Sequence, residues 1–350
     1  MKRILLLSSL MISIFLMLFS CQHKKETRPR VFVLTDINID SGDPDDRQSL
    51  IHLLWFANEL DIQGIVPDRW DARGLVACQL VVAAYDKDYI EFQFDKKGYP
   101  TPSAVKNSLA VDFNDAVSRF QKAASEEKSP LYVLIWGSMV NFGEVLRANP
   151  ELSKNIRVIT IGTDLMMEAH RPHLPESWEK TEKPCEQYNW NGHGRNQIFN
   201  DARFKDMWWL EINWTYEGMF SGDEPAEMFE KLSVYGDLGK HIKEVVKNES
   251  WAQYFRVGDT PSVLYVIDPN HELDDPTQSS WAGKFTKPFP AERPNYYTDL
   301  NGPVEWDYAN PYSTWENHIE MNAYAKSTLE ERRPEMYNAL LNKLDEIYKN

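Results

Sequence analysis

Cysteine, histidine and basic residues are scarce in this chain, and each scarcity excludes a class of site or partner. The 350 residues include only 3 Cys and 8 His, and the cysteines are too scattered for a disulfide framework or a zinc site. His170 and His173 are spaced for one face of a turn, but with no Cys nearby a solvated loop is favoured over zinc. Cys78 and Cys185 could still pair in an oxidising compartment. Lysine and arginine number 38 against 53 aspartate and glutamate, for a formal net charge of -15. This balance argues against nucleic acid as a partner, since phosphate binding needs clustered basic side chains.

Long hydrophobic runs are confined to the N-terminus. Residues 4–19 are apolar, follow a basic start and end just before Cys21. The run is short for a spanning helix and fits the apolar region of a signal peptide. The small residue before Cys21 resembles the lipobox of bacterial lipoproteins, whose cysteine is acylated; an ordinary signal peptide with an incidental cysteine is the alternative. We expect a bacterial cell-envelope protein that meets the membrane only through a lipid on Cys21. Its expected divisions are a lipoprotein signal peptide over 1–21, a tether over 22–28 and one domain over 29–350.

Strand-like and helix-like segments alternate along the chain. Apolar β-branched runs predict buried strands at 31–34, 61–66, 131–136 and 156–161. Periodic apolar residues predict helices at 48–60, 75–85, 116–124, 225–232, 238–246, 260–267 and 329–348. Residues 166–200 and 270–315 read as long irregular stretches. The alternation is typical of an α/β fold, a Rossmann-like mostly parallel sheet with helices on both faces.

Aspartates crowd the turn that follows the first predicted strand. Asp40, Asp43, Asp45 and Asp46 fall within positions 40–46. Carboxylates this close raise one another's pKa unless a cation neutralises them. Ca²⁺ and Mg²⁺ prefer oxygen ligands, so the cluster predicts a site for a hard divalent metal. The alternative is a helix cap by Asp45 or Asp46, although a cap needs only one aspartate.

The position of this turn also favours a ligand site. In open parallel sheets, ligands bind outside the carboxyl ends of the strands. Gly137 and Gly162 follow two other predicted strands, so the same edge of the sheet should collect residues from several strands. One site at this edge is therefore expected from the pattern alone.

The aspartate-rich turn resembles the Asp-x-Asp-Pro-Gly-x-Asp-Asp signature of the nucleoside hydrolase superfamily. The run over 28–50 is more similar to a secreted bacterial branch of that superfamily, often labelled cellulose-binding protein. Further similar segments lie at 136–141, 188–191, 258–262 and 280–285. The likeness extends over roughly residues 28–325 and implies a nucleoside hydrolase-like fold.

The resemblance implies a metal-dependent hydrolase of glycosidic bonds that acts on N-ribosyl or related sugar compounds, with Ca²⁺ as its cofactor. In the superfamily, Ca²⁺ held by aspartates binds the ribose diol and a water. Carried over to this sequence, the implied metal ligands are Asp40, Asp45, Asp46, Asp259 and the backbone carbonyl near Val140. The catalytic base on the water is Asp40 or Asp43, since the turn here is one residue longer than the signature.

The implied substrate is a small sugar or nucleoside-like molecule. Residues expected to bind it are Asp45, Asn141, Glu186, Asn189, Trp190 and Asn191. For the two asparagines of the long stretch a turn role is the alternative, and for Trp190 the alternative is anchoring of its loop. Superfamily members often assemble as dimers or tetramers, so a homo-oligomer is compatible with the resemblance.

One departure from the superfamily leaves the chemistry open. Residue 258 is Gly, where several nucleoside hydrolases carry a His that helps the base leave. Departure of a leaving group would then need another donor, such as His193 or Arg195. Aromatic residues make up 13% of the chain, and such rings can form sugar-stacking surfaces. The second interpretation is therefore a non-catalytic, Ca²⁺-dependent carbohydrate-binding envelope lipoprotein.

Overall fold

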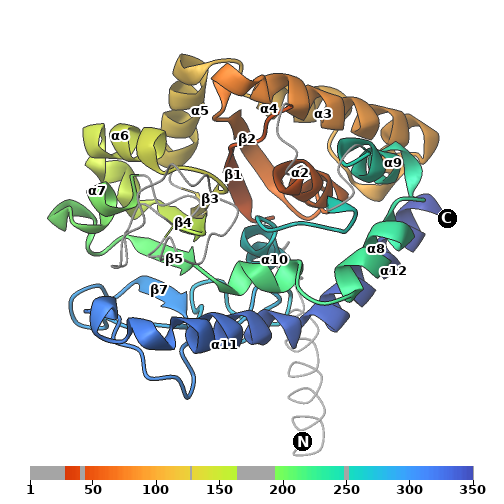
Figure 1. Ribbon diagram of the computed structural model, residues 1–350. Helices are drawn as coiled ribbons and strands as arrows, with labels where there is room; N and C mark the ends of the chain where they lie inside the picture. The colour runs from red at the N-terminus through yellow and green to blue at the C-terminus, as the bar shows by residue number, and fades with distance from the viewer. Residues whose placement is uncertain (1–27, 40–43, 127, 164–193, 248–251, 350) are drawn as a thin grey trace, which may run out of the picture.

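The computed structural model describes residues 28–39, 44–126, 128–163, 194–247 and 252–349 (Figure 1). Its strands are β1 (Arg30–Thr35), β2 (Asp61–Pro67), β3 (Leu131–Ile135), β4 (Ile156–Ile161), β5 (Trp208–Ile212), β6 (Phe285–Thr286) and β7 (Tyr296–Asp299). Its α-helices are α2 (Asp45–Trp55), α3 (Gly74–Glu91), α4 (Pro102–Ser108), α5 (Phe113–Ser125), α6 (Val140–Ala148), α7 (Arg195–Phe199), α8 (Glu224–Leu232), α9 (Gly236–Val245), α10 (Pro261–Ile267), α11 (His318–Glu330) and α12 (Arg333–Tyr348).

All the strands join one sheet in the order β2-β1-β3-β4-β5-β7-β6. Every pair is parallel except β6 with β7. The strand order reverses at β1, with β2 on one side and β3 on the other, and such a switch point is where α/β sheets bind ligands. Thr35 pairs with Pro67 at the end of β1 and β2. The next residues, Asp36 and Asp68, therefore leave the sheet side by side.

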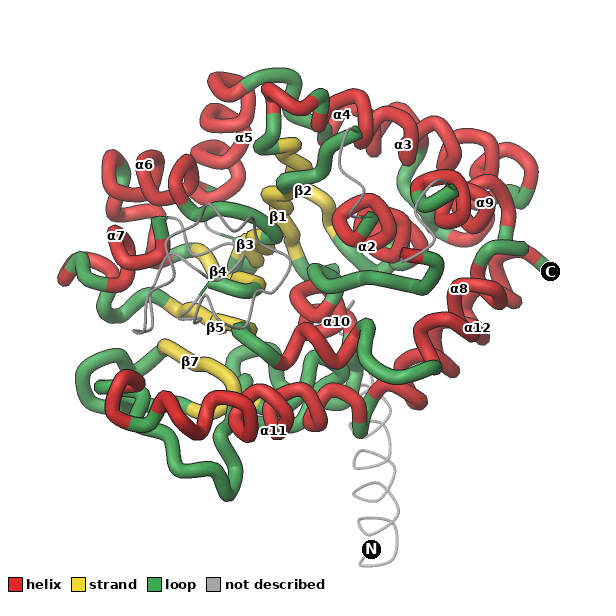
Figure 2. The backbone as a smooth tube through the Cα atoms, in the orientation of Figure 1, coloured by secondary structure: helices red, strands yellow, loops and turns green. Residues whose placement is uncertain are grey.

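Helices cover both faces of the sheet (Figures 1 and 2). The side chains of β1 alternate between two cores, as strand geometry requires: Val31 and Val33 belong to one, Phe32 and Leu34 to the other. The first core is completed by α2, α3, α8, α9, α10 and α12, and the second by α5, α6 and α7. This arrangement confirms the predicted α/β fold with helices on both faces of a mostly parallel sheet.

Four predicted strands are confirmed, while several element boundaries were wrong. The first helix begins at Asp45 rather than at 48, and the predicted C-terminal helix begins at Arg333 rather than at 329, after a separate helix, α11, that was not predicted. The strand β5 was missed because its sequence, WWLEI, contains a charged residue and lacks the expected β-branched run. Short strands β6 and β7 lie within the stretch 270–315 that was predicted to be irregular.

The last helix is tied to the first core by a buried polar cluster. The Tyr348 hydroxyl donates to Asp88 at 2.7 Å and accepts a hydrogen bond from Trp55 Nε1 at 3.1 Å. The same Asp88 carboxylate accepts the backbone N–H groups of Asp237 and Leu238 at the start of α9. Asp88 thus joins α3, α9 and α12 at one point.

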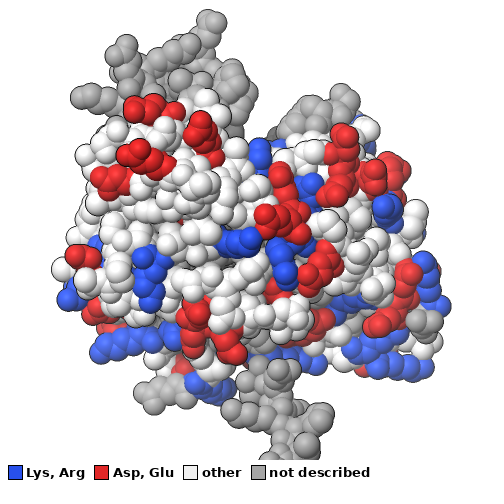
Figure 3. Space-filling view, turned by 90° about the horizontal axis from the view of Figure 1, so that it is seen from below, with Lys and Arg blue, Asp and Glu red and all other residues white. Residues whose placement is uncertain are grey.

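The face of the molecule in Figure 3 carries both acidic and basic side chains. Within the described ranges, none of the helices combines the length and the apolar character needed to cross a membrane. Cys78 is a buried free thiol in α3. Its possible partner, Cys185, lies outside the described residues.

Candidate metal and substrate site

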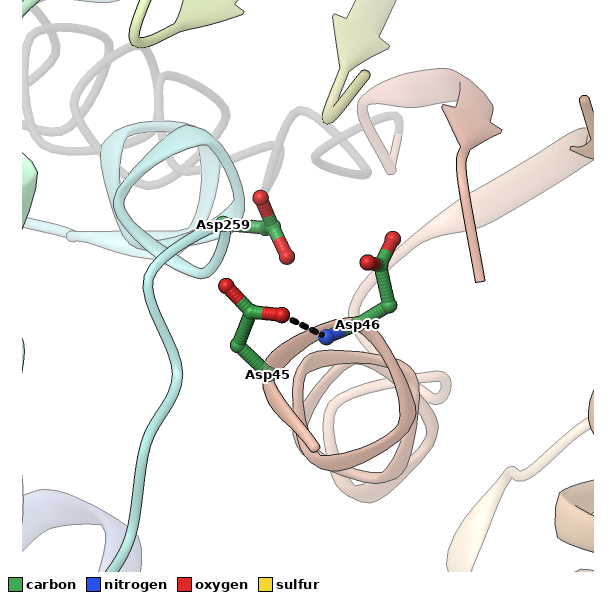
Figure 4. A group of neighbouring side chains, drawn as sticks. All are labelled: Asp45, Asp46 and Asp259. Carbon is green, nitrogen blue, oxygen red and sulfur yellow. Dashed lines mark hydrogen bonds between the residues drawn. The ribbon is translucent and has the colours of Figure 1, made fainter. Parts of the chain in front are cut away.

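Three carboxylates from distant parts of the chain meet at the carboxyl edge of the sheet. Asp45 and Asp46 form the start of α2, and Asp259 lies across from them just before α10 (Figure 4). One oxygen from each side chain lies within 4.8 Å of the others. Asp259 is buried, whereas Asp45 and Asp46 are half-buried. The structure therefore brings together three of the aspartates that the resemblance assigned to a metal.

The negative charges of these carboxylates repel one another when no cation lies between them. Burial, together with the charges of Asp36, Asp259 and Asp45, raises the pKa of Asp46 well above its ordinary value. A hydrogen bond from the Thr35 hydroxyl acts in the opposite direction. The N-cap residue of α2 is Pro44, so neither aspartate occupies the capping position that the alternative interpretation required.

The donor set fits a single hard cation. Oxygen atoms that both lie at about 2.4 Å from one Ca²⁺ can be no more than about 4.8 Å apart. The three aspartate oxygens meet this limit. Carboxylates alone, without sulfur or imidazole nearby in the cluster, are typical of Ca²⁺, Mg²⁺ or Mn²⁺ rather than zinc. An acidic cluster suited to a metal is thus present, and the identity of the metal stays a prediction.

A fourth carboxylate, Asp36, was not assigned a role from the sequence. It follows β1 directly, and its charge raises the pKa of both Asp46 and Asp68. Gly137, which follows β3, leaves room for it, because a Cβ there would lie only 2.8 Å from the Cβ of Asp36. Its place at the carboxyl end of the first strand is the signal that could have identified it.

A second polar pair lies on the other face of the same edge. Asn141 Nδ2, near the start of α6, donates to Asp68 Oδ1 at 2.7 Å. Burial raises the pKa of Asp68 to about 6; the hydrogen bond from Asn141 lowers it and the charge of Asp36 raises it. The pair borders a crevice of about 30 Å³ whose remaining walls are apolar, including Phe113 and Val145.

Of the other predicted site residues, the structure describes Val140, and most of the rest lie outside its described ranges. Val140 is the first residue of α6, and its N–H donates to the Ser138 hydroxyl at 3.2 Å. Gly194 packs directly on it, since a Cβ on Gly194 would lie 2.6 Å from Val140 N. The ligand role of the Val140 carbonyl stays a prediction. Predictions on Cys21, Asp40, Asp43, Glu186, Asn189, Trp190, Asn191 and His193 fall outside the described residues.

Arg195 cannot donate a proton to a leaving group in this geometry, contrary to one expectation. Its Nε and Nη2 atoms donate to the two carboxylate oxygens of Glu211 at 3.0 and 2.9 Å. Tyr296 and Thr163 donate to the same carboxylate. Burial raises the pKa of Glu211, but the Arg195 ion pair and these hydrogen bonds outweigh it and hold the pKa below its ordinary value. An arginine held in such a pair stays protonated.

The structure also accounts for the glycine at position 258. A Cβ there would lie 3.2 Å from Asp45 Oδ2 and 3.5 Å from the rings of both Phe220 and Tyr216. A side chain at this position would already contact both rings at its Cβ and would require the Asp45 carboxylate to shift. The packing leaves no side chain at 258 to help a leaving group depart.

A family comparison agrees with these features. Residues 30–285 match the family described as cellulose-binding Sde182, nucleoside hydrolase-like domain. The chain belongs to this family. The range shared with the Sde182 family includes the three converging aspartates, Asp36 and Asp68, and it confirms the resemblance to the nucleoside hydrolase-like branch labelled cellulose-binding. No curated protein matches the chain.

Solved structures of low sequence identity share the Sde182-type fold. A nucleoside hydrolase-related protein from Saccharophagus degradans, associated with carbohydrate metabolism, has a TM-score of 0.58 and 16% identity over 92% of this chain and 72% of that chain. An inosine-guanosine nucleoside hydrolase has a TM-score of 0.52 and 13% identity over 92% of this chain and 99% of that chain. At such identities the likeness shows the nucleoside hydrolase-like fold alone.

Proposed function

We propose that this Sde182-family protein hydrolyses glycosidic bonds of sugar or N-ribosyl compounds with the help of a divalent metal. The observation that carries the proposal is the convergence of Asp45, Asp46 and Asp259 within 4.8 Å at the switch point of the sheet. Membership of a nucleoside hydrolase-like family supports the same chemistry. The substrate would be a small molecule held at this edge.

The three aspartates would hold the cation, which we propose to be Ca²⁺, with Asp40 and the carbonyl near Val140 as further ligands. A bound divalent ion lowers the pKa of a nearby water and stabilises developing negative charge. The remaining steps belong to the protein. Asp40 or Asp43 would accept a proton from the attacking water, and Asp45 would hydrogen-bond a sugar hydroxyl. Further contacts to the sugar would come from Asn141, Glu186, Asn189, Trp190 and Asn191.

A calorimetric Ca²⁺ titration of the full chain tests the metal, and an assay of released sugar from nucleosides and 4-nitrophenyl glycosides tests the reaction. We expect about one ion per chain and measurable turnover, with both lost in Asp259→Asn. Asp61→Asn is the matched control, because Asp61 is exposed at the opposite, amino end of β2. Turnover that survives Asp259→Asn at the wild-type rate would contradict the proposal.

The second candidate is a non-catalytic, Ca²⁺-dependent carbohydrate-binding protein. The family description as cellulose-binding favours it, as does the packed Gly258, which offers no group to a leaving base. Binding of cello-oligosaccharides that requires Ca²⁺, without any released sugar after long incubation, would decide for this candidate. Release of sugar at a rate that tracks the enzyme concentration would decide against it.

For the location, we propose that acylation of Cys21 holds the protein at the bacterial cell envelope. The basis is the apolar N-terminal run that ends at this cysteine. Stable anchoring requires more than one acyl chain, so Cys21 should carry several. Mass spectrometry of the N-terminal peptide from cells tests this, and an unmodified Cys21 in the mature protein would refute it.

A further inference from the structure

We infer that Asp68 is the acid that donates a proton to the leaving group, acting from the opposite side of the sheet edge to Asp45, Asp46 and Asp259. The inference rests on the proposed hydrolysis and adds a residue to it. Sequence patterns did not single out Asp68, and the resemblance assigns it no role.

The register of the sheet places the two groups of carboxylates on opposite faces. Thr35 points toward α2, where its hydroxyl bonds to Asp46. Asp36 directly follows β1, and its charge acts on both Asp46 and Asp68, so it lies between the two groups. Asp68 lies on the opposite face, because Val66 belongs to the core under α5 and α6, and Asn141 of α6 bonds to Asp68. A molecule at the switch point would meet carboxyl groups from both sides.

Two carboxyl groups on opposite sides of the scissile bond are what glycoside hydrolysis ordinarily requires. One must be ionised and the other must carry a proton. In this protein the ionised group would be the base proposed above, Asp40 or Asp43, next to the metal-binding aspartates. The group that carries a proton would be Asp68, which lies beside another carboxylate, Asp36.

The surroundings of Asp68 favour its protonated form. From β1 it meets the charge of Asp36, from α6 the neutral amide of Asn141, and from α5 the apolar side chain of Phe113. The adjacent Arg69 donates from Nε to the exposed Asp71 at 3.2 Å, and its charge also interacts with those of Asp36 and Asp46. Burial is the largest cause of the rise in the pKa of Asp68 to about 6. A carboxyl group with such a pKa can carry a proton near neutral pH and still release it.

Two other positions are unsuited to donate this proton. Gly258 has no side chain, and Arg195 is held by Glu211. In the reaction, the bond from the anomeric carbon to the leaving atom breaks, and its electron pair stays on the leaving atom. That atom takes the proton of the Asp68 carboxyl. Water supplies the hydroxyl to the anomeric carbon and its remaining proton to the base, and Asp68 regains a proton from solvent.

Substrates whose leaving groups differ in their need for a proton test the role of Asp68. In Asp68→Asn, turnover of a substrate with a poor leaving group, such as a disaccharide or nucleoside, should fall about 10²–10⁴-fold. Turnover of the matching 4-nitrophenyl glycoside should fall less than about tenfold, because nitrophenolate leaves without a proton. Asp61→Asn is again the control. Equal losses on both substrates would overturn the inference, since a purely structural role predicts them.

Two further measurements keep the test decisive. Asn141→Ala removes the hydrogen bond that lowers the pKa of Asp68, so the alkaline limb of the pH–rate profile should move to higher pH. An unmoved limb would refute the assignment. Carboxyl ¹³C resonances of the labelled full chain should include one that titrates near pH 6 and is missing in Asp68→Asn; its absence from the wild type would also refute it.

Failure of the proposed function gives a different pattern. If the wild-type chain binds no Ca²⁺ or releases no sugar from any substrate, the hydrolase proposal falls and the inference falls with it. The other case is an active wild type and an Asp68→Asn variant that still binds Ca²⁺ with unchanged affinity. The comparison of turnover losses on poor and good leaving groups then tests only the role of Asp68, and the hydrolase proposal stands either way. The calorimetric titration therefore separates the two failures.

Discussion

Replacing Asp46 with asparagine should make the metal-free protein more stable and abolish its stabilisation by Ca²⁺. Asn preserves the size of the side chain and can still accept the hydrogen bond from the Thr35 hydroxyl. Two like charges no more than 4.8 Å apart repel each other by roughly 3.5 kcal/mol at an effective dielectric constant of about 20. Because Asp46 is half-buried and can bind a proton, we expect a smaller gain, about 1–3 kcal/mol in the free energy of unfolding.

Urea unfolding followed by tryptophan fluorescence, in chelator and in Ca²⁺, measures both effects. The wild type should gain about 2.7 kcal/mol when free Ca²⁺ exceeds its dissociation constant 100-fold, whereas Asp46→Asn should gain almost nothing. Asp61→Asn, which removes an exposed charge elsewhere, should behave like the wild type in both buffers. If Asp46→Asn is less stable than the wild type in chelator, the reasoning from charge repulsion is wrong.

Two other predictions concern stability. Arg195→Met should lower the free energy of unfolding in urea by about 3–5 kcal/mol, because it leaves the buried Glu211 carboxylate without its ion-pair partner. The double variant Arg195→Met with Glu211→Gln should lose less than the sum of the two single losses. Losses that simply add would contradict the pairing. Burial raises the pKa of Asp299 to about 6, so the folded protein binds a proton at this carboxyl more tightly than the unfolded chain does. The stability gained from this proton is complete below the pKa of the unfolded chain and is lost as the pH rises through 6. Asp299→Asn should therefore remove up to about 3 kcal/mol of pH dependence between pH 4 and 7, and parallel curves for variant and wild type would contradict this.

Much of the fold follows from local pattern, and the misses have a physical cause. The strands β1 to β4 are apolar and β-branched because both of their faces are covered by helices. The strand β5 carries Glu211 inside the sheet, where the ion pair with Arg195 from a separate segment, together with hydrogen bonds from Tyr296 and Thr163, makes its charge tolerable. The local sequence of β5 gives no sign of Arg195, which lies in another segment. Burial of a charge depends on tertiary contacts that local sequence does not report.

The candidate site was predictable in part for a similar reason. Clustered aspartates in one turn are unusual enough to be noticed, and the resemblance supplied Asp259 at the far end of the chain. Asp36 and Asp68 are single aspartates after strands, a common position for turn residues. Their proximity depends on the pairing of Thr35 with Pro67 across β1 and β2. Strand register is a property of the folded sheet, so neither residue stood out beforehand.

The attachment of α12 sets a condition on when the protein can fold during its synthesis. The core around α2 and α3 is closed by residues of α12, and Tyr348 completes the hydrogen bonds of Asp88 and Trp55. At about 5–20 residues per second, a ribosome needs roughly 15–60 s to go from Trp55 to that tyrosine, 293 residues later. Throughout that time the growing chain cannot close this core, so it stays open to chaperones and to any export machinery that requires an unfolded polypeptide.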